Sequence, residues 1–414
     1  MKILDEVLAD VKPSVEEDRK IMAKVDEILS KVKSNVLDAK AVLGGSGAKG
    51  TWLRGMHDAD MFVLFDYEKF KGRSEEISDI LEKSIKKVFK NLIRLHGSRD
   101  YFQLKRDGFT YEIIPILEIK KANDAMNITD ISPLHAKWVN KHKKLRDEIL
   151  LTKQFCKANN CYGAESYIKG FSGYICEILT IYYGGFLNLV KNAAKWKGKV
   201  VIDVEGYHKG KDVMFELNKS KTYSPIIVVD PVQKERNASA ALSEEKFEVF
   251  RSRCKEFVRK PSKNFFEIEK IDLDKLEKKA VGKNLLILDV KALEGKEDVV
   301  GAKLLKVYEH IVKMMKFYEF NVLSSGWEWE EGSDAMFYFI VDKKELSKTK
   351  LQMGPPLKVK EHVNEFKKKH KNAFEKNGKV YADVKRKFVN VIDMVKDEVG
   401  SEYVKGRVGA VKIR

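Results

Sequence analysis

Apolar residues follow two different spacings along the first 120 residues. Positions three and four apart predict a helix from Ile3 to about Lys33, interrupted at Pro13. Alternation with a period of two predicts strands in AKAVLGG, MHDADMFVLF and FTYEIIPIL. The segment EEISDILEKSIKKVFKNLI between them is typical of an amphipathic helix. Strands that alternate with helices over such a short stretch indicate a compact α/β unit.

From Trp138 to Phe257 the pattern becomes largely helical. We expect helices in HKKLRDEILLTKQFCKANN, YICEILTIYYGGFLNLVKNAAKW and SEEKFEVFRSRCKEFVRK. The stretch Ile178–Val190 is free of charge over 13 residues. It is too short to span a bilayer, so it predicts a buried helix.

A second mixed region follows the helical one. Its predicted order is a strand in NLLILDV, a helix in GAKLLKVYEHIVKMMKFY, and strands in FNVLSSGWEWE and DAMFYFIVD. This β-α-β-β order is compatible with a ferredoxin-like or RNA-recognition-motif-like sheet. The segment MGPP (Met353–Pro356) is expected to break the chain before a basic helix, KVKEHVNEFKKKHKNAFEK.

The charge of the chain favours a polyanionic partner. The 414 residues include 79 Lys and Arg against 62 Asp and Glu, a formal charge of +17. Lysines set against phosphates release condensed counterions, which favours nucleic-acid binding, although solvated lysines that only keep the protein soluble remain the alternative. From Leu351 onward there are 16 basic and 8 acidic residues, so this segment adds +8.

The cysteines and the N-terminus favour a cytoplasmic location. Cys156, Cys161, Cys176 and Cys254 form no C-x-x-C pair, so we expect reduced thiols and no structural zinc site. The first residues, MKILDEVLADVK, are charged from the start and contain no signal-peptide core.

The stretch VLGGSGAKGTWLRGMHDADMFVLF carries the candidate chemistry. Asp58 and Asp60 are two apart on a predicted strand and therefore share one face. Like charges this close are costly unless a cation lies between them, and Mg²⁺ takes one or two carboxylates together with phosphate oxygens. Ser46 is flanked by glycines just before a predicted short helix, AKGTWL, and can offer a hydroxyl to a phosphate, as Lys49 can offer a charge.

A third carboxylate would complete a two-metal site. Glu112, in TYEIIPIL, is the only acidic residue inside the next predicted strand. Taken singly, D-x-D describes many solvated loop carboxylates, and Glu112 could face solvent on an edge strand. The conjunction of a Gly-Ser turn, a helix, D-x-D on an apolar strand and a later strand carboxylate favours the palm of a nucleotidyltransferase that works by metal-assisted phosphoryl transfer.

The sequence resembles the archaeal-type (class I) CCA-adding tRNA nucleotidyltransferases. GGSGAKGTWLRGMHDADMFVLF resembles the catalytic core of that family, YEIIPIL its third-carboxylate strand, and DISPLHAKWV its T-P-x-H-x-x-W segment. KQFCKANNCYGAESYIKGFSGYICEILTIYYGGFLNLVKNAAKW is similar to the neck helices, VVDPVQKERNASAALS to the D-P-x-x-x-x-R-N loop, and MGPPLKVKEHVNEF to the tail element. The likeness spans essentially the whole chain in the order of the family.

The resemblance implies a fold and an activity. The fold is α+β and multidomain: a polymerase β-like palm or head (1–140), a helical neck (141–257), and an RNA-binding body and tail (258–414). The activity is template-independent addition of C, C and A to the 3′ end of tRNA from CTP and ATP, with release of pyrophosphate. Homodimers are possible in such a family.

The resemblance also assigns residues. Asp58, Asp60 and Glu112 would be catalytic and would hold two Mg²⁺ ions. The nucleotide would be bound by Ser46, Lys49, Ser132, His135, Lys153, Tyr162 and Arg236. Ser132 would approach the ribose, and Arg236 would read the base edge, for which its fixed fork of donors is suited. The alternatives are a packed structural His135, a Tyr162 in the core, a surface-capping Arg236 and a merely solvated tail helix.

Three departures from the family pattern bear on activity. The family usually has Asp where Glu112 stands and Arg where Lys49 stands, and SRDYF, around Ser98 and Arg99, replaces a His-Pro-Tyr. A longer carboxylate side chain alters metal geometry, and lysine lacks the bidentate phosphate contact of arginine. We expect an active enzyme with a reduced rate or altered nucleotide choice.

Three other functions compete with this interpretation. One is a poly(A)- or oligo(A)-type RNA nucleotidyltransferase, and another is a catalytically weakened RNA-binding relative. A small-molecule nucleotidyltransferase is disfavoured, because a small acceptor needs no large basic surface.

Overall fold

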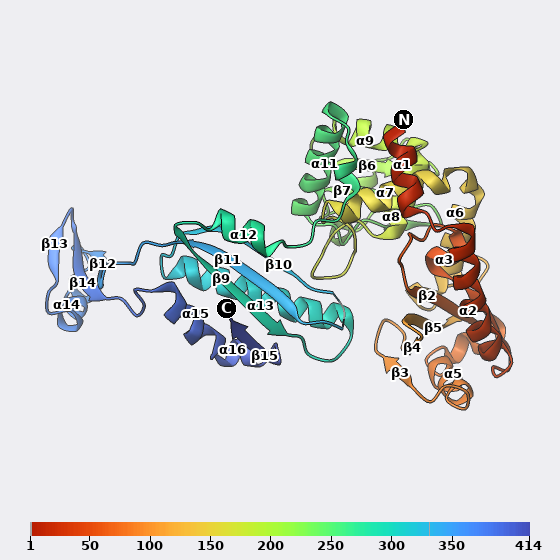
Figure 1. The fold of residues 1–414 in the computed structure, drawn as a ribbon, viewed down its shortest axis with the longest axis horizontal. Helices are drawn as coiled ribbons and strands as arrows, with labels where there is room; N and C mark the ends of the chain where they lie inside the picture. The colour runs from red at the N-terminus through yellow and green to blue at the C-terminus, as the bar shows by residue number, and fades with distance from the viewer. Residues whose placement is uncertain (1, 331) are drawn as a thin grey trace. The chain divides into compact units, whose positions relative to one another are not determined.

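The computed structural model describes residues 2–330 and 332–414, which form two compact units, Met1–Glu269 and Lys270–Arg414 (Figure 1). Each unit has sheets and a core of its own. The α-helices of the first unit are α1 (Lys2–Val11), α2 (Val15–Lys33), α3 (Gly45–Lys49), α4 (Tyr67–Phe70), α5 (Ile77–Ile85), α6 (Ser132–Val139), α7 (Arg146–Ala158), α8 (Gly173–Tyr183), α9 (Phe186–Ala193), α10 (Val213–Glu216) and α11 (Glu244–Arg259). Its strands are β1 (Ala39–Leu43), β2 (Asp58–Phe65), β3 (Leu92–Leu95), β4 (Tyr101–Arg106), β5 (Phe109–Leu117), β6 (Val200–Asp203), β7 (Ile226–Asp230) and β8 (Gln233–Asn237). Short 3₁₀ helices lie at η1 (Lys71–Arg73), η2 (Ala122–Asp124), η3 (Ile128–Ile131), η4 (Asn140–Leu145), η5 (Lys219–Lys221) and η6 (Lys263–Phe266).

The N-terminal helix is interrupted where the sequence predicts it. Helix α1 ends before Pro13 and α2 begins just after it, because Ser14 and Glu17 form a capping box. The backbone N–H of Glu17 donates to Ser14 Oγ at 3.2 Å, and the backbone N–H of Ser14 donates to Glu17 Oε2 at 2.7 Å. These bonds satisfy donors that the first turn of a helix otherwise leaves without partners.

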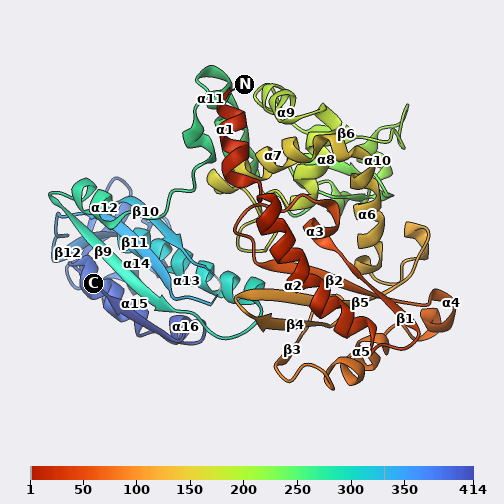
Figure 2. The same ribbon diagram turned by 45° about the vertical axis from the view of Figure 1, so that its right-hand side comes forward.

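A five-stranded sheet forms the base of the first unit, in the order β1-β2-β5-β4-β3. Strands β2 and β5 are parallel and the other neighbours are antiparallel. Helices α2 and α5 pack on one face of this sheet, and Figure 2 shows α2 lying across the strands. The predicted strands β1, β2 and β5 are confirmed. The predicted helix that continues through NLI is too long, because α5 ends at Ile85 and β3 begins at Leu92.

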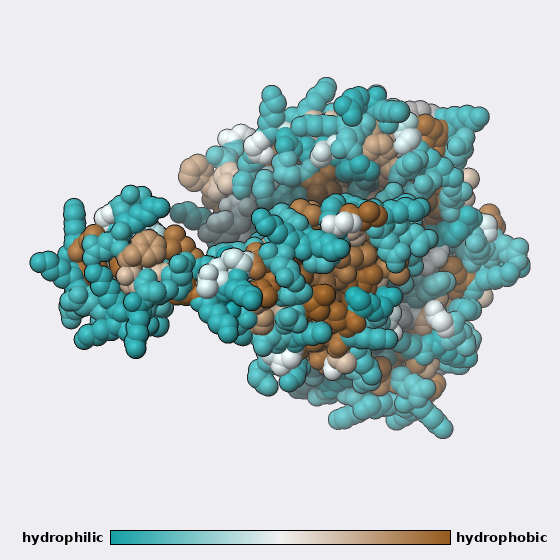
Figure 3. Space-filling model, turned by 60° about the vertical axis from the view of Figure 1, so that its left-hand side comes forward, coloured by the Kyte–Doolittle hydropathy of each residue, from teal (hydrophilic) through white to brown (hydrophobic). Residues whose placement is uncertain are grey.

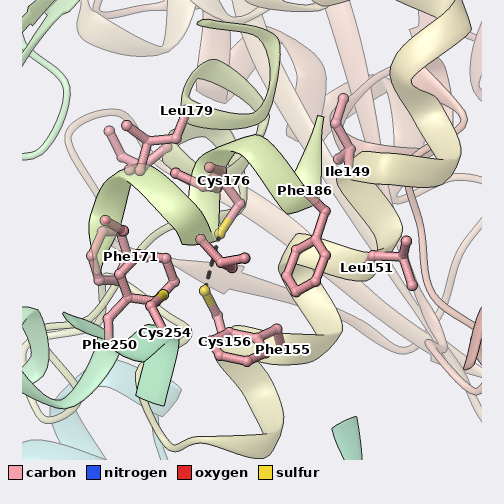
Figure 4. Packing of buried hydrophobic residues seen from close by; sticks show 14 of the residues in the cluster. Ile149, Leu151, Phe155, Cys156, Phe171, Cys176, Leu179, Phe186, Phe250 and Cys254 are labelled. Carbon is pink, nitrogen blue, oxygen red and sulfur yellow. Dashed lines mark hydrogen bonds between the residues drawn. The ribbon is translucent and has the colours of Figure 1, made fainter. Parts of the chain in front are cut away.

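The rest of the first unit is built on a core of helices α7, α8, α9 and α11. Figure 4 shows rings from three of these helices, Phe155, Phe186 and Phe250, gathered in that core. All four cysteines of the chain are buried and free. The sulfurs of Cys156 and Cys176 are 3.8 Å apart.

Two predictions for this region are wrong. The long apolar helix is in fact two, α8 and α9, which meet at an angle of 93°. The break lies at Gly184 and Gly185, whose φ angles of 71° and 135° suit glycine but not a helix interior. The region also contains a three-stranded sheet, β6-β7-β8, which the helical interpretation missed. Among the described residues no single helix is long and apolar enough to cross a membrane, although α8 and α9 together pass that test by length and composition.

The second unit contains a ferredoxin-like domain. Its helices are α12 (Leu273–Lys279), α13 (Glu297–Phe317), α14 (Lys360–Lys369), α15 (Val391–Val399) and α16 (Glu402–Lys405). Its strands are β9 (Lys283–Lys291), β10 (Val322–Glu328), β11 (Ala335–Asp342), β12 (Thr349–Pro356), β13 (Phe374–Lys376), β14 (Lys379–Lys385) and β15 (Ala410–Ile413). The main sheet has the order β10-β11-β9-β15 with every neighbouring pair antiparallel, so the predicted β-α-β-β pattern is confirmed and β15 completes it.

Strands β12, β14 and β13 form a separate small sheet that carries α14. The predicted break at MGPP is confirmed, because strand β12 ends at Pro356 with an irregular register and the basic helix α14 begins at Lys360. The predicted basic helix is too long, because Phe374–Lys376 form strand β13. The prolines are tolerated because β12 is an edge strand. Figure 3 shows one face of the molecule, where hydrophilic side chains cover most of the surface.

Candidate active site

The three predicted carboxylates lie on the same face of the five-stranded sheet. In β2, Ala59, Met61 and Val63 are buried in the core against α2 and α5. Asp58 and Asp60 alternate with them and therefore face the opposite side. In β5, Tyr111 and Ile113 enter the same core, so Glu112 also faces away from it, directly opposite Asp60 in the register.

The electrostatics of this face suit a cation. Burial, and then the charge of Asp58, raise the pKa of Asp60 to about 6, and Lys49 opposes this shift. Asp58 is exposed. A divalent cation would relieve the repulsion between the two aspartates. In the described ranges, no three His, Cys, Asp or Glu side chains are already arranged to hold a metal ion. The carboxylates are hard oxygen donors that fit Mg²⁺, whose remaining ligands would then be nucleotide phosphates and water.

Helix α3 lies directly over Asp60, and only glycine allows it to do so. The backbone N–H of Gly44 donates to Asp60 O at 2.7 Å. A Cβ on Gly45 would lie 1.7 Å from Asp60 Oδ2, and Gly45 has a φ of +54°. The short helix begins earlier than predicted, so Ser46 lies inside it and Thr51 lies beyond its end.

Two predicted phosphate-binding lysines meet at one buried carboxylate. Lys49 Nζ donates to Glu177 Oε2 at 2.8 Å, and Lys153 Nζ donates to Glu177 Oε1 at 2.8 Å. Burial alone would raise the pKa of Glu177, but the charges of Lys153 and Lys49 outweigh it and lower the pKa to about 2. Glu177 is therefore ionised throughout the physiological range.

The two lysines differ in how their donors are used. Lys153 Nζ also donates to Thr51 O and Thr51 Oγ1, each at 3.0 Å, so its three N–H donors all have protein acceptors. For Lys49, Glu177 is the one acceptor found among the described residues, and the ring centroid of Tyr174 lies 5.2 Å from its Nζ. In this arrangement Lys49 has donors to offer to a phosphate, whereas Lys153 would have to exchange a partner.

His135 and Arg236 meet at a second buried carboxylate, Asp230. His135 Nε2 lies 3.1 Å from Asp230 Oδ2, and the Arg236 guanidinium donates to the same oxygen. Tyr174 links this group to the lysines, since its ring centroid is 4.1 Å from that of His135. Burial lowers the pKa of His135, although Asp230 opposes the shift. Burial would raise the pKa of Asp230, but His135 and then Arg236 lower it.

Ser132 begins α6, and the departures at Ser98 and Arg99 help to hold the loop before it. Arg99 forms a buried ion pair with Asp130, whose carboxylate also accepts the backbone N–H of Leu117 at 2.9 Å. Ser98 Oγ donates to Asn127 Oδ1 at 3.1 Å. These two departures therefore make structural contacts that fix the segment leading to Ser132.

Tyr162 pairs with Phe171 in an isolated bridge, and Lys157 lies over its ring at 5.3 Å. Burial lowers the pKa of Lys157, while the charge of Asp58 raises it, so this lysine lies within electrostatic reach of the carboxylate face. The structure thus gathers residues from α3, α6, α7, β2, β5 and β8 around one place in the first unit.

Comparison with known proteins agrees with this arrangement. Three family models match successive parts of the chain: a nucleotidyltransferase domain at residues 25–130, the second domain of tRNA nucleotidyltransferase at 147–267, and the C-terminal domain of CCA-adding enzyme at 281–408. The CCA-adding enzyme of Nanoarchaeum equitans is 35% identical over 93% of this chain and 93% of its own length. That of Methanocaldococcus jannaschii is 32% identical, covering 96% of this chain and 90% of its own length. The chain belongs to the family of CCA-adding enzymes.

Solved structures show the same fold at lower identity. The Cid1 poly(U) polymerase is 17% identical and covers 65% of this chain and 98% of its own length, with a TM-score of 0.52. At that identity the likeness shows the fold alone. The assignment to the CCA-adding family rests on its relatives in sequence.

The sequence analysis did not predict several residues that the structure places in the candidate active site. They are Thr51, Lys157, Tyr174, Glu177 and Asp230. A signal was present for the acids, because Glu177 stands in the apolar helix YICEILTIYY and Asp230 follows the apolar run IIVV. A carboxylate in such surroundings is expected to have a buried cationic partner.

Proposed function

We propose that this protein adds C, C and A in turn to the 3′ end of tRNA, using CTP and ATP and releasing pyrophosphate. One observation carries the proposal: the carboxylate face of β2 and β5 lies close to the cluster around Glu177 and to the cluster around Asp230. The chain that holds this arrangement has a nucleotidyltransferase domain and is similar to a CCA-adding enzyme over 93% of its length. We assign residues 1–140 to a catalytic head, 141–257 to a neck, and 258–414 to a body and tail.

Asp58, Asp60 and Glu112 would hold two Mg²⁺ ions. When bound, these ions would stabilise the charge of the triphosphate and favour the ionised form of the attacking hydroxyl. Glu112 is one methylene longer than the usual Asp, but it lies in register with Asp60 on the neighbouring strand. We therefore expect the substitution to slow the reaction rather than abolish it.

The reaction joins the 3′ oxygen of the tRNA to the α-phosphorus of the nucleotide. The bond from the α-phosphorus to the bridging oxygen breaks, that oxygen leaves with pyrophosphate, and the 3′ hydroxyl loses its proton. Most of the catalysis is positioning and charge stabilisation. Ser46 and Lys49 of α3, with His135, Lys153 and Tyr162, would hold the triphosphate in line.

Selection of the base would lie with Arg236. Its guanidinium has five N–H donors, and Asp230 binds one end of the fork. Asp230 thereby orients the remaining donors toward a base edge, while Ser132 would approach the ribose. Cytosine and adenine differ from uracil and guanine in the donors and acceptors of that edge, which gives Arg236 a chemical basis for discrimination.

The decisive experiment uses a tRNA transcript that lacks its 3′ CCA. The protein is incubated with Mg²⁺ and CTP, ATP or both, and the products are read at nucleotide resolution. Addition of CC with CTP alone, and of CCA with both nucleotides, supports the proposal. A long A tract would indicate a poly(A)-type enzyme instead, and binding of tRNA without extension would indicate a weakened relative. Chelation of divalent cations is expected to stop the reaction.

A further inference from the structure

Glu177 has no role in the reaction as proposed above, yet it binds two of the residues assigned to the triphosphate. Its side chain is on α8, in the apolar core. Glu177 is 1% exposed, Lys153 2% and Lys49 9%. A buried carboxylate carries a large desolvation cost, so its placement calls for specific partners.

The contacts of Glu177 are divided between its two oxygens. Oε2 accepts from Lys49 at 2.8 Å, and Oε1 accepts from Lys153 at 2.8 Å and from Thr51 Oγ1 at 2.7 Å. Each lysine therefore binds a different oxygen of the carboxylate. The hydroxyl of Thr51 accepts a hydrogen bond from Lys153 and donates one to the same carboxylate oxygen that Lys153 binds. The two ammonium groups come from α3 and α7, so Glu177 of α8 fixes their separation.

The charges of this cluster do not cancel. Two ammonium groups and one carboxylate leave a single positive charge in a buried place. Lys49 is close enough to Asp60 and to His135 for its charge to lower the pKa of both. Without Glu177 the two lysines would repel each other, and their positions would no longer be fixed.

We propose that Glu177 is a positioning residue for the triphosphate, an inference that rests on the proposed function. It holds Lys49 and Lys153 at a fixed separation, with a net positive charge, before the nucleotide arrives. Since the triphosphate is common to CTP and ATP, Glu177 acts on both nucleotides equally. The choice between bases belongs to the separate cluster around Asp230.

The test compares Glu177→Gln with Glu177→Asp and with the control Glu148→Gln. Glu177→Gln keeps the shape of the side chain and loses its charge. Glu177→Asp keeps the charge and shortens the side chain, and it serves as the second variant if Glu177→Gln does not fold. Glu148 lies on α7, is half-buried, and accepts the backbone N–H of Phe186 at 2.8 Å. Thermal melting, KM for CTP, ATP and tRNA, kcat, and direct binding of CTP by equilibrium dialysis are measured for each protein.

We expect each Glu177 variant to raise KM for CTP and KM for ATP by equal factors. For Glu177→Gln the rise should be about tenfold, which corresponds to the loss of one charge-assisted hydrogen bond. Dialysis should show the same loss, while KM for tRNA and the fidelity of C and A addition stay unchanged. Glu148→Gln should leave the nucleotide KM values at wild-type level. Nucleotide KM values within about twofold of wild type in a folded Glu177 variant would overturn the inference. A rise in KM for tRNA by the same factor as KM for the nucleotides would also overturn it, since that indicates a general structural role rather than an effect on the triphosphate. A wild-type protein that fails to extend tRNA would contradict the proposed function instead.

Discussion

Asp60 lies under α3 and beside Asp58, where burial and a like charge both oppose its ionised form. Replacing it with asparagine removes that cost, so Asp60→Asn is expected to stabilise the metal-free protein at neutral pH by about 1 kcal/mol. The same change removes one of the proposed ligands for Mg²⁺ and should abolish nucleotide transfer. Urea unfolding in the presence of EDTA and the tRNA extension assay measure the two effects.

A matched control for this prediction is Asp66→Asn. Asp66 follows the same strand and caps α4, where its Oδ1 accepts the backbone N–H of Lys69 at 2.8 Å. Asparagine also caps helices well, so this variant should change neither stability nor activity appreciably. Activity above background in Asp60→Asn would contradict its role as a metal ligand.

Asp230 orients Arg236 and His135 together. Asp230→Asn would keep the shape of the side chain but weaken its hold on the guanidinium, so that the fork is no longer fixed against the base. We expect misincorporation of UTP and GTP to rise by about tenfold relative to CTP, which corresponds to the loss of one charged hydrogen bond. Competition between nucleotides on a CCA-less tRNA measures this ratio.

The control for base selection is Asp212→Asn, an N-cap of α10 whose Oδ1 accepts the backbone N–H of Met214 at 2.9 Å. It should leave the misincorporation ratio unchanged. If Asp230→Asn slows all nucleotides equally, Arg236 is not oriented for base reading by this carboxylate.

At the scale of secondary-structure elements, the seating of α3 on β2 depends on a glycine. Gly45→Ala would put a Cβ 1.7 Å from Asp60 Oδ2 at a positive φ, so α3 or Asp60 must move. We expect a loss of about 100-fold in kcat, because small displacements of catalytic groups are costly. Single-turnover kinetics of C addition measures it.

Gly55→Ala provides the control for backbone strain. Gly55 also has a positive φ, of +78°, but a Cβ there would meet nothing within 4 Å among the described atoms. Both variants should lose about 1 kcal/mol of stability from strain. An equal loss of kcat in the two variants would show that strain, rather than contact with Asp60, is responsible.

Glu177 of α8 forms hydrogen bonds with Lys153 of α7, with Lys49 of α3 and with Thr51. The stability that these bonds give to the fold should depend on pH. The pKa of Glu177 is lowered in the folded protein from 4.5 to about 2. The unfolded chain therefore binds a proton first as the pH falls. The stabilisation from its ionised form, about 3 kcal/mol at most, is complete above pH 4.5 and is lost as the pH falls toward 2. Urea unfolding between pH 6 and 3 should show the stability gap between wild type and Glu177→Gln narrowing toward acid pH. A constant gap would contradict the prediction.

How well the elements could be predicted depended on whether their pattern was local. Strands β2 and β5 alternate over eight and nine residues, and the face that carries Asp58, Asp60 and Glu112 followed from that alternation. Strands β6 and β15 have four residues each and exist because distant strands pair with them, so no local period reveals them. The same holds for Glu177 and Asp230. Their positions in apolar surroundings indicated that each needs a partner, but only the fold shows that the partners are Lys49, Lys153, His135 and Arg236.

At the scale of the whole molecule, part of the excess positive charge lies on helix α14 and the small sheet that carries it, in the second unit. Lys368, Lys369 and Lys371 are exposed there. Replacing all three with glutamine should weaken tRNA binding and reduce the slope of log affinity against log salt by about one to three, while KM for CTP stays unchanged. Filter binding at several salt concentrations measures this slope.

Three exposed lysines give a control with the same change in charge: Lys83 in α5, and Lys87 and Lys90 in the segment that follows it. If replacing them weakens tRNA binding as much as the change at α14 does, net charge rather than the surface at α14 attracts the tRNA. If neither set matters, the contact with tRNA lies elsewhere.

Strand β15 determines when the main sheet of the second unit can finish folding during synthesis. It pairs with β9, which is 119 residues or more earlier in the chain, and the backbone N–H of Arg414 donates to Ile287 O at 2.8 Å. Until residues 410–413 have left the ribosome, one edge of β9 has no neighbouring strand. A nascent chain in that state exposes an apolar strand edge, which is the kind of surface that chaperones bind and that aggregates form on. A message cut short before codon 410 would therefore yield a protein with a complete first unit and an unfinished sheet in the second, which quality control can recognise and remove.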